Sequence, residues 1–226
     1  EASDVLDKDM FFDRILEAYT IEGRLVCIPK SFYINAVFGR TSEVGSETGW
    51  TAERVMALAD RYPDRRLLAI DDTFLVNRLF GIWLCEQYID WESGECTFDS
   101  EEFCGFLEWL KTYLDRIQGA YGYEPLPEDC LLYMEDIVRL CDRVMYEWKI
   151  GEEITFIGHP TSDSRSCIPA ETENVLCITS HSGHKEGAWD FLESFLAAEG
   201  TRSSCFSSRQ DCFRRDISIR RTGRSR

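Results

Sequence analysis

The sequence of 226 residues lacks several features that would assign it to a class at once. It has no run of about 18 uncharged apolar residues, which a helix needs to cross a bilayer. Its ten cysteines form no C-x-x-C pair, which excludes the common zinc and thioredoxin-like motifs. The G-x-S-x-G, phosphate-loop and dinucleotide-binding glycine patterns are also missing. No charged-then-apolar leader is present, so we expect any signal peptide to lie outside this sequence.

Histidine is scarce, with only His159, His181 and His184 in the chain. The last two lie in SHSGHK, where serine and glycine suggest a loop that begins a helix. Because no carboxylate or thiol follows at a fixed spacing, we expect no metal site and no other cofactor. Adjacent acids such as Glu101-Glu102 point in different directions on a helix, which favours a solvated surface over a glycosidase dyad. We therefore expect no enzymatic activity.

Negative charge dominates the chain, with a formal net charge of −16. Residues 202–226 hold eight arginines and two aspartates, a net +6, so the preceding residues carry −22. An acidic body repels phosphate, so we expect no nucleic acid as partner. The basic end lacks the apolar residues needed for folding, so we expect residues 214–226 to form a disordered tail. Binding of a polyanion or a membrane surface by this tail is the alternative.

Apolar periodicity predicts alternating helices and strands. We expect an amphipathic helix over residues 4–19, a helix opened by Thr51, and another that begins at Asp99 or Ser100. A long apolar stripe predicts a single helix over Glu128–Trp148, and the final helix carries the apolar residues of GAWDFLESFL.

Short apolar runs predict the strands. These are Arg24–Ile28, Tyr33–Phe38, Leu67–Ile70, Ile154–Gly158 and Val175–Ile178. Because proline cannot donate to a strand ladder, Pro29 is expected to divide the first two. Ala170–Asn174 is expected to be a polar loop. Cys104 and Cys141 fall on apolar helix faces and are expected to be buried thiols.

Five phrases carry a resemblance to a known family. They are Glu22-Gly23-Arg24-Leu25 running to Ile28-Pro29, Gly49-Trp50-Thr51, IDWESGECTFDSEEF over 89–103, TFIGHPT over 155–161, and KEGAW over 185–189. In order and spacing over residues 5–213, they resemble the extracellular solute-binding proteins of ABC importers. The resemblance is to family 1, the carbohydrate-binding type of the Gram-positive lipoprotein group.

This resemblance implies an α/β fold of the type II periplasmic-binding-protein kind. Because family members are nearly twice this length, the sequence is expected to be an internal fragment with one nearly complete lobe and part of the other. The expected divisions are 1–33 for a lobe-one remnant and first hinge crossing, 34–169 for lobe two, 170–213 for the return crossing and a lobe-one helix, and 214–226 for the tail. Cys27 and Cys177 would each lie in a hinge strand, so we expect them to be near each other. Pairing of the cysteines as disulfides cannot be deduced from sequence.

A sugar-binding protein needs aromatic faces for pyranose rings and polar groups for hydroxyls, at the ends of strands that meet the ligand. By position in the family, the candidate ligand-binding residues follow three strands. They are Ser31, Phe32 and Tyr33 after Pro29, Asp72, Thr73 and Phe74 after Leu67–Ile70, and His159 after Ile154–Gly158.

The function implied by the resemblance is that of the substrate-binding component of an ABC importer. It would capture a carbohydrate outside the cytoplasm and present it to membrane permease subunits. The parent protein would be a cell-surface lipoprotein, held to the membrane only by a lipid anchor outside this chain. The alternatives are a carbohydrate-active hydrolase with paired carboxylates and a non-transport extracellular interaction protein. A peptide or polyamine remains open as the ligand, and the chain alone is expected to bind sugar weakly or not at all.

Overall fold

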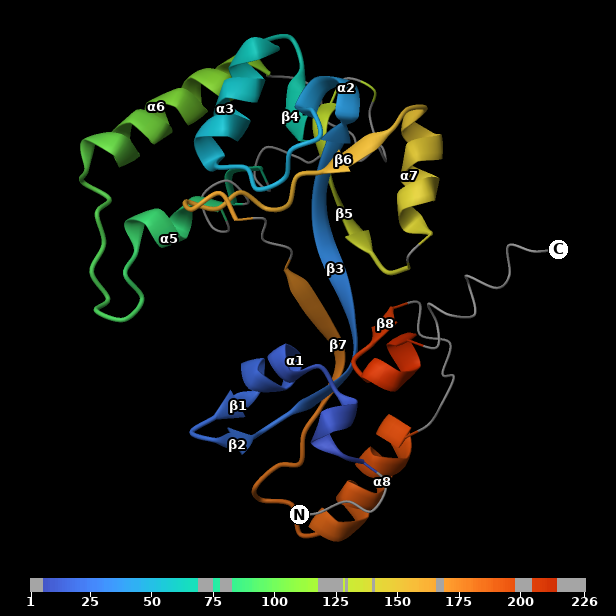
Figure 1. Ribbon diagram of the computed structural model, residues 1–226. Helices are drawn as coiled ribbons and strands as arrows, with labels where there is room; N and C mark the ends of the chain where they lie inside the picture. The colour runs from blue at the N-terminus through green and yellow to red at the C-terminus, as the bar shows by residue number, and fades with distance from the viewer. Residues whose placement is uncertain are drawn as a thin grey trace, which may run out of the picture. The chain divides into compact units, whose positions relative to one another are not determined.

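The computed structural model describes residues 6–68, 75–77, 83–117, 128, 130–139, 141–165, 169–197 and 205–214. The chain divides into two compact units, whose elements are labelled in Figure 1. Unit 1 is drawn from Glu1–Ile34, Ile137–Asp142 and Ala170–Arg226, and unit 2 from Asn35–Asp136 and Arg143–Pro169. Strand β3, Ile28–Arg40, contributes its first residues to unit 1 and the rest to unit 2.

Unit 2 is built on a mixed sheet with the strand order β4-β5-β3-β6. Strands β4 and β5 run parallel, and β6 is antiparallel to β3. The other elements that contribute to this unit are α2 Thr41–Val44, α3 Ala52–Arg61, β4 Arg66–Leu68, α5 Cys85–Tyr88, α6 Glu101–Arg116, β5 Cys130–Ile137, α7 Asp142–Ile150 and β6 Ile154–Phe156.

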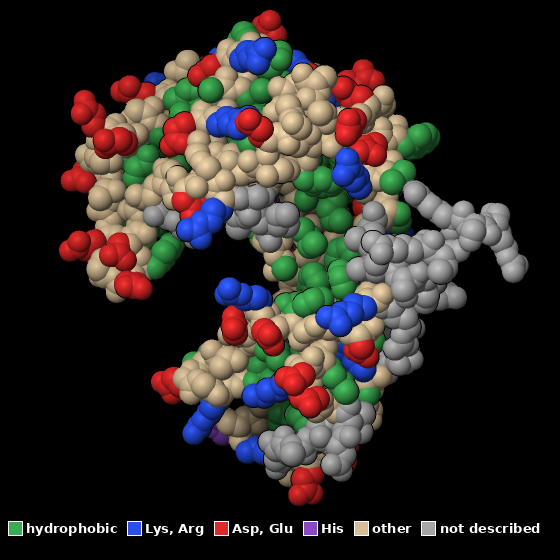
Figure 2. Space-filling model, viewed as in Figure 1, with side chains coloured by type: hydrophobic (Ala, Val, Ile, Leu, Met, Phe, Trp, Pro, Cys, Tyr) green, Lys and Arg blue, Asp and Glu red, His purple; other side chains and the backbone are tan. Residues whose placement is uncertain are grey.

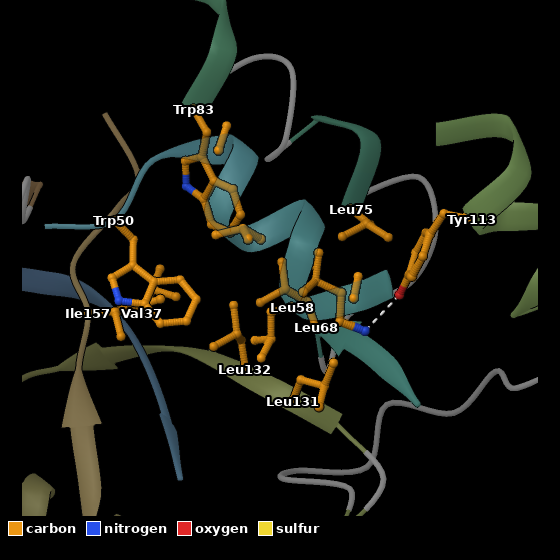
Figure 3. Packing of buried hydrophobic residues seen from close by; sticks show 14 of the residues in the cluster. Val37, Trp50, Leu58, Leu68, Leu75, Trp83, Tyr113, Leu131, Leu132 and Ile157 are labelled. Atoms are coloured by element: carbon orange, nitrogen blue, oxygen red, sulfur yellow. Dashed lines mark hydrogen bonds between the residues drawn. The ribbon is translucent and has the colours of Figure 1, made fainter. Parts of the chain in front are cut away.

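Helices cover both faces of this sheet (Figure 1). On one face, α3 and α6 bury their apolar stripes against Val37 of β3 and Leu132 of β5, together with Trp50 and Trp83 (Figure 3). The fully buried Tyr113 of α6 accepts a hydrogen bond from the backbone N–H of Leu67 at 2.6 Å. Burial raises the pKa of Tyr113, so the phenol stays neutral. Its hydrogen bond with Leu67 links α6 to β4.

The opposite face of the same sheet is aromatic. Phe38 stacks on Tyr133 of β5 with ring centroids 5.7 Å apart, and it also contacts Tyr146 of α7 and Phe156 of β6. Since Val37 and Phe38 point to opposite faces, β3 is buried on both sides in unit 2. A strand buried on both faces needs no polar alternation, which accounts for the apolar sequence of this stretch.

Two helices of unit 2 begin at hydroxyl caps. Thr51 accepts a hydrogen bond from the backbone N–H of Arg54, and Ser100 accepts one from Phe103. Each cap satisfies one of the free N–H groups of a first helical turn and contributes about 1 kcal/mol. The predicted helix start at Thr51 is therefore confirmed, and of the two alternatives for the second helix, Asp99 and Ser100, the cap is Ser100.

Unit 1 contains shorter elements. They are η1 Lys8–Met10, α1 Asp13–Ala18, β1 Thr20–Ile21, β2 Arg24–Leu25, β7 Ala170–Leu176, α8 Lys185–Ala197 and β8 Phe206–Ser207. Strands β7 and β8 pair antiparallel with the first part of β3. The β1–β2 hairpin turns at Glu22 and Gly23, which have φ of 51° and 75°. Positive φ at both turn residues matches the right-handed twist of a hairpin and favours glycine at the second.

Three predictions for unit 1 are wrong. Pro29 does not divide an extended segment, because β3 is continuous from Ile28 to Arg40. Pro29 is the second residue of the strand and is paired with Val175 of β7, so the N–H that it lacks affects only the beginning of the ladder. Ala170–Asn174 is part of β7, not a loop. In residues 4–19, η1 and α1 replace one helix.

The predicted helix over Glu128–Trp148 is also wrong. Residues Cys130–Ile137 form strand β5, and only Asp142–Ile150 is helical. The run Cys130–Tyr133 is completely buried because it runs through the middle of the sheet. Cys104 and Cys141 are exposed rather than buried. Among the described residues, no helix has the length and apolarity needed to cross a membrane.

Candidate ligand site

A line of hydrogen bonds runs through unit 2 from a buried indole to an exposed carboxylate. Trp83 donates its N–H to Nδ1 of His159 at 3.0 Å, and Nε2 of His159 lies 2.9 Å from Oδ1 of Asn35. Asn35 in turn donates from Nδ2 to Oδ1 of Asp136 at 2.8 Å. Trp83, His159 and Asn35 are buried, whereas Asp136 is exposed. We call these four residues the Trp83–Asp136 line.

The direction of each hydrogen bond in the line is fixed by chemistry. An indole N–H can only donate, so Nδ1 of His159 must accept. The proton of the neutral imidazole is therefore on Nε2, which donates to the side-chain oxygen of Asn35. With its oxygen accepting, Asn35 presents its NH₂ group to Asp136. Every buried polar atom of the line thus has a partner, as a buried polar network requires.

The backbone holds the line in place. Asn35 lies on β3, and its N–H donates to the carbonyl of Pro169 at 3.0 Å. The segment that carries His159 is fixed on either side, because Ile157 donates to Val37 and Thr161 donates to Trp50. The imidazole also meets the Trp83 ring edge to face, at a centroid distance of 6.1 Å.

Asp136 is the part of the line that a ligand can reach. It lies next to the carboxyl end of β5, which is the edge where ligands bind in open α/β sheets. Asn35 holds Oδ1, and within the described part of the chain Oδ2 makes no hydrogen bond. A carboxylate with one oriented oxygen and one open oxygen can accept hydrogen bonds from ligand hydroxyls, and bonds to a charged acceptor are about twice as strong as neutral ones.

The ligand-binding residues predicted from the sequence lie in several different surroundings. His159 is 2% exposed and uses both ring nitrogens inside unit 2, so it orients Asn35. Ser31 is 1% exposed and accepts from Nδ2 of Asn174 at 3.3 Å. Phe32 packs among aromatic rings of unit 1. Tyr33 is half-buried and donates to Oε2 of Glu171 at 2.5 Å. Asp72, Thr73 and Phe74 lie outside the described residues.

Sequence analysis missed Asn35 and Asp136. A usable signal existed for Asn35, since it is a polar residue inside the apolar strand YINAVF and a buried amide needs a partner. Asp136 was hidden because its segment was expected to be helical.

Among the described residues, one polar and one largely apolar cavity lie away from Asp136. A polar cavity of about 360 Å³ in unit 2 contains Arg40, Arg65 and Lys149, but Arg40 contacts Glu152 and Arg65 contacts Glu43. Its arginines are thus held by acids of the same cavity. A cavity of about 310 Å³ in unit 1 is lined mainly by apolar residues, together with Asp7 and Lys8. Among the described residues, no group of three histidine, cysteine or acidic side chains could hold a metal ion.

The fold is shared with known sugar-binding proteins. The chain superposes on the sugar-binding protein MalE from the phytopathogen Xanthomonas citri with a TM-score of 0.57, 15% identity, and 96% of this chain and 61% of that chain covered. It also superposes on the cyclic α-maltosyl-1,6-maltose binding protein from Arthrobacter globiformis with a TM-score of 0.52 and 16% identity. That superposition covers 85% of this chain and 54% of the other. No family model matches the sequence, and no curated protein sequence matches it.

A third similar structure is an ABC transporter solute-binding protein from Thermotoga lettingae bound with α-D-tagatose. The TM-score is 0.52 at 11% identity, with 93% of this chain and 61% of that chain covered. The chain thus spans between 54% and 61% of the length of these three structures. The expected fold class is confirmed: this is the α/β fold of periplasmic sugar-binding proteins.

Proposed function

We propose that this chain belongs to the substrate-binding component of an ABC importer and takes part in capturing a carbohydrate. The observation that carries the proposal is the exposed carboxylate of Asp136, oriented by Asn35 at the carboxyl end of β5, in a fold shared with sugar-binding proteins. A sugar presents several hydroxyl donors, and an oriented carboxylate is a suitable acceptor for them.

The Trp83–Asp136 line also suggests how specificity arises. Because Asn35 fixes one oxygen of Asp136, the other keeps a defined direction without an entropic cost at the moment of binding. His159 and Trp83 act behind Asn35 and do not need to touch the ligand. Tyr33, with its partner Glu171, is an accessible polar pair of unit 1 and is a separate candidate for a hydroxyl contact.

The surface of unit 2 agrees with a neutral ligand. Acidic side chains follow the edge of unit 2 at α6 and the segment before it (Figure 2). A strongly acidic surface repels nucleic acids and phosphorylated compounds but has no such effect on an uncharged sugar. We propose an extracytoplasmic location with permease subunits as membrane partners and a lipid anchor outside this chain, as in the Gram-positive lipoprotein group.

The proposal is tested by saturation-transfer NMR on the full chain. Maltose and D-tagatose are compared with a peptide and with a polyamine, each at millimolar concentration. We expect transfer to at least one sugar and loss of most of it in Asp136→Asn. The matched control is Asp64→Asn, which removes an exposed carboxylate from the turn between α3 and β4 and should leave the signal unchanged.

Two results would oppose the proposal. Saturation transfer to the peptide or the polyamine, but to no sugar, would show that the ligand is not a carbohydrate. Sugar transfer that is equal in wild type, Asp136→Asn and Asp64→Asn would remove Asp136 from the site.

A further inference from the structure

Two cysteines of unit 1 face each other across a pair of strands. The antiparallel register of β3 and β7 pairs Ile28 with Leu176 and Pro29 with Val175. One step outward in the same register places Cys27 opposite Cys177. Residues directly opposite each other in an antiparallel pair have Cα atoms about 4.5–5.5 Å apart, which is within the range of about 4.4–6.8 Å found for disulfides.

The side chains are in contact as well as in register. The pKa of the Cys27 thiol is raised, mainly by burial and further by the neighbouring Cys177, to which it is hydrogen-bonded. The expected proximity of these two cysteines is thus confirmed. Cys177 is exposed and Cys27 is partly exposed, so a small oxidant can reach the pair.

From this geometry we propose that Cys27 and Cys177 form a dithiol site that a low-molecular-weight disulfide, such as oxidised glutathione, converts to an intramolecular disulfide. The exposed Cys177 thiolate attacks one sulfur of the oxidant, forms a mixed disulfide and releases one glutathione thiolate. Cys27 then loses its proton to solvent and attacks Sγ of Cys177, which releases the second glutathione. The two protein thiols are oxidised and one glutathione disulfide is reduced to two thiols.

The position of this disulfide gives it a structural effect. Every residue of unit 2 lies between Cys27 and Cys177 in the sequence, so the disulfide closes a covalent loop that contains the whole of unit 2. A cross-link over so long a loop restricts the unfolded chain and stabilises the fold. We expect oxidation to raise the Tm by about 5–15 °C. Dithiothreitol should remove this gain, and renewed treatment with oxidant should restore it.

Peptide mapping tests the site directly. The reduced full chain is incubated with oxidised glutathione, its remaining thiols are alkylated, and it is cleaved with trypsin and a glutamate-specific protease. Trypsin alone leaves Cys167 and Cys177 in one peptide, so the second protease is needed to separate them after Glu173. We expect LVCIPK, which carries Cys27, joined to NVLCITSHSGHK, which carries Cys177.

Two variants separate the steps. Cys27→Ser should retain one glutathione on Cys177, because no second thiol is available to release it, and should lose the gain in Tm. Cys104→Ser, which alters an exposed cysteine of α6, should form the Cys27–Cys177 cross-link as wild type does. Full alkylation of both Cys27 and Cys177 after exposure to oxidant, or a cross-link from either to another cysteine in preference, would overturn the proposal.

Discussion

Trp83 donates its indole N–H to Nδ1 of His159 across 3.0 Å, and this single contact fixes the tautomer of the imidazole. The proton that remains on Nε2 fixes the orientation of the Asn35 amide, which in turn orients Asp136. A buried tryptophan therefore determines which way an exposed carboxylate faces, and that relationship can be tested without any ligand.

The first prediction concerns this tautomer. Trp83→Phe removes the donor to Nδ1 of the buried His159, at a cost of about 1–3 kcal/mol of stability in addition to lost packing. Nitrogen NMR shifts of His159 should report the Nε2–H form in the wild type and a mixture of tautomers in the variant.

The matched control for that variant is Trp50→Phe. Trp50 is as buried as Trp83, and its indole N–H donates to the carbonyl of Glu47. The Trp50→Phe substitution removes that bond, so it should destabilise the protein by a similar amount and leave the His159 tautomer unchanged. A wild-type His159 protonated on Nδ1 would contradict the assignment of the whole line.

The second prediction is a pH dependence of stability at Glu135 of β5. Burial is the main cause that raises the pKa of Glu135, and the hydrogen bond from Tyr146 and the charge of Lys149 oppose it only in part. A carboxyl group whose pKa is raised by folding is costly when ionised. The loss of stability from ionised Glu135 is therefore complete at pH values above its pKa in the folded state. It vanishes below its pKa in the unfolded state, which is about 4.3.

Glu135→Gln should therefore stabilise the protein at pH 7, by about 1–3 °C in Tm after allowance for solvent screening. The gain should disappear as the pH falls below about 4. Glu108→Gln, at an exposed position on α6, is the control and should show no comparable pH-dependent gain. Thermal melts between these pH values decide the matter, and a destabilised Glu135→Gln at pH 7 would contradict the argument.

The third prediction compares two glycines. A Cβ on Gly39 of β3 would lie 2.9 Å from the carbonyl oxygen of Leu131 and 2.6 Å from Cγ1 of Val44, so Gly39→Ala forces these elements apart. We expect a loss of about 1–3 kcal/mol in the free energy of unfolding. Gly105 of α6 is exposed and has no atom within 4 Å of an added Cβ. Gly105→Ala should stabilise by about 0.5–1 kcal/mol, since alanine favours a helix. Urea denaturation measures both, and equal effects would contradict the packing described for β3.

The sequence was sufficient for the features that depend on local chemistry. The hydroxyl cap at Thr51 was predicted correctly, and Ser100 was one of the two caps predicted for the next helix. The α/β fold class was also predicted correctly. The error over Glu128–Trp148 arose because β5 is an apolar run followed closely by an amphipathic helix, and the two together imitate one helical stripe. Only the sheet, which buries Cys130–Tyr133 of β5 completely, separates the two possibilities.

The candidate site could not be predicted because it depends on contacts between distant residues. Asn35 and Asp136 are 101 positions apart, and Asn35 and His159 are 124 apart. His159 was expected at the ligand from its position after a strand, but whether an imidazole faces a ligand or a tryptophan depends on tertiary packing. The same holds for Ser31 and Phe32, whose burial follows from the packing of unit 1.

The central claim is that a carbohydrate binds next to the Trp83–Asp136 line, and a protein-observed NMR titration tests it most directly. The indole N–H of Trp83 and the side-chain amide of Asn35 give separate signals from the two ends of the buried part of the line. Adding maltose or D-tagatose to the full chain should shift both signals, with a Kd on the order of millimolar and with no shift in Asp136→Asn. Signals that stay in place with every sugar, while the protein remains folded, would contradict the account.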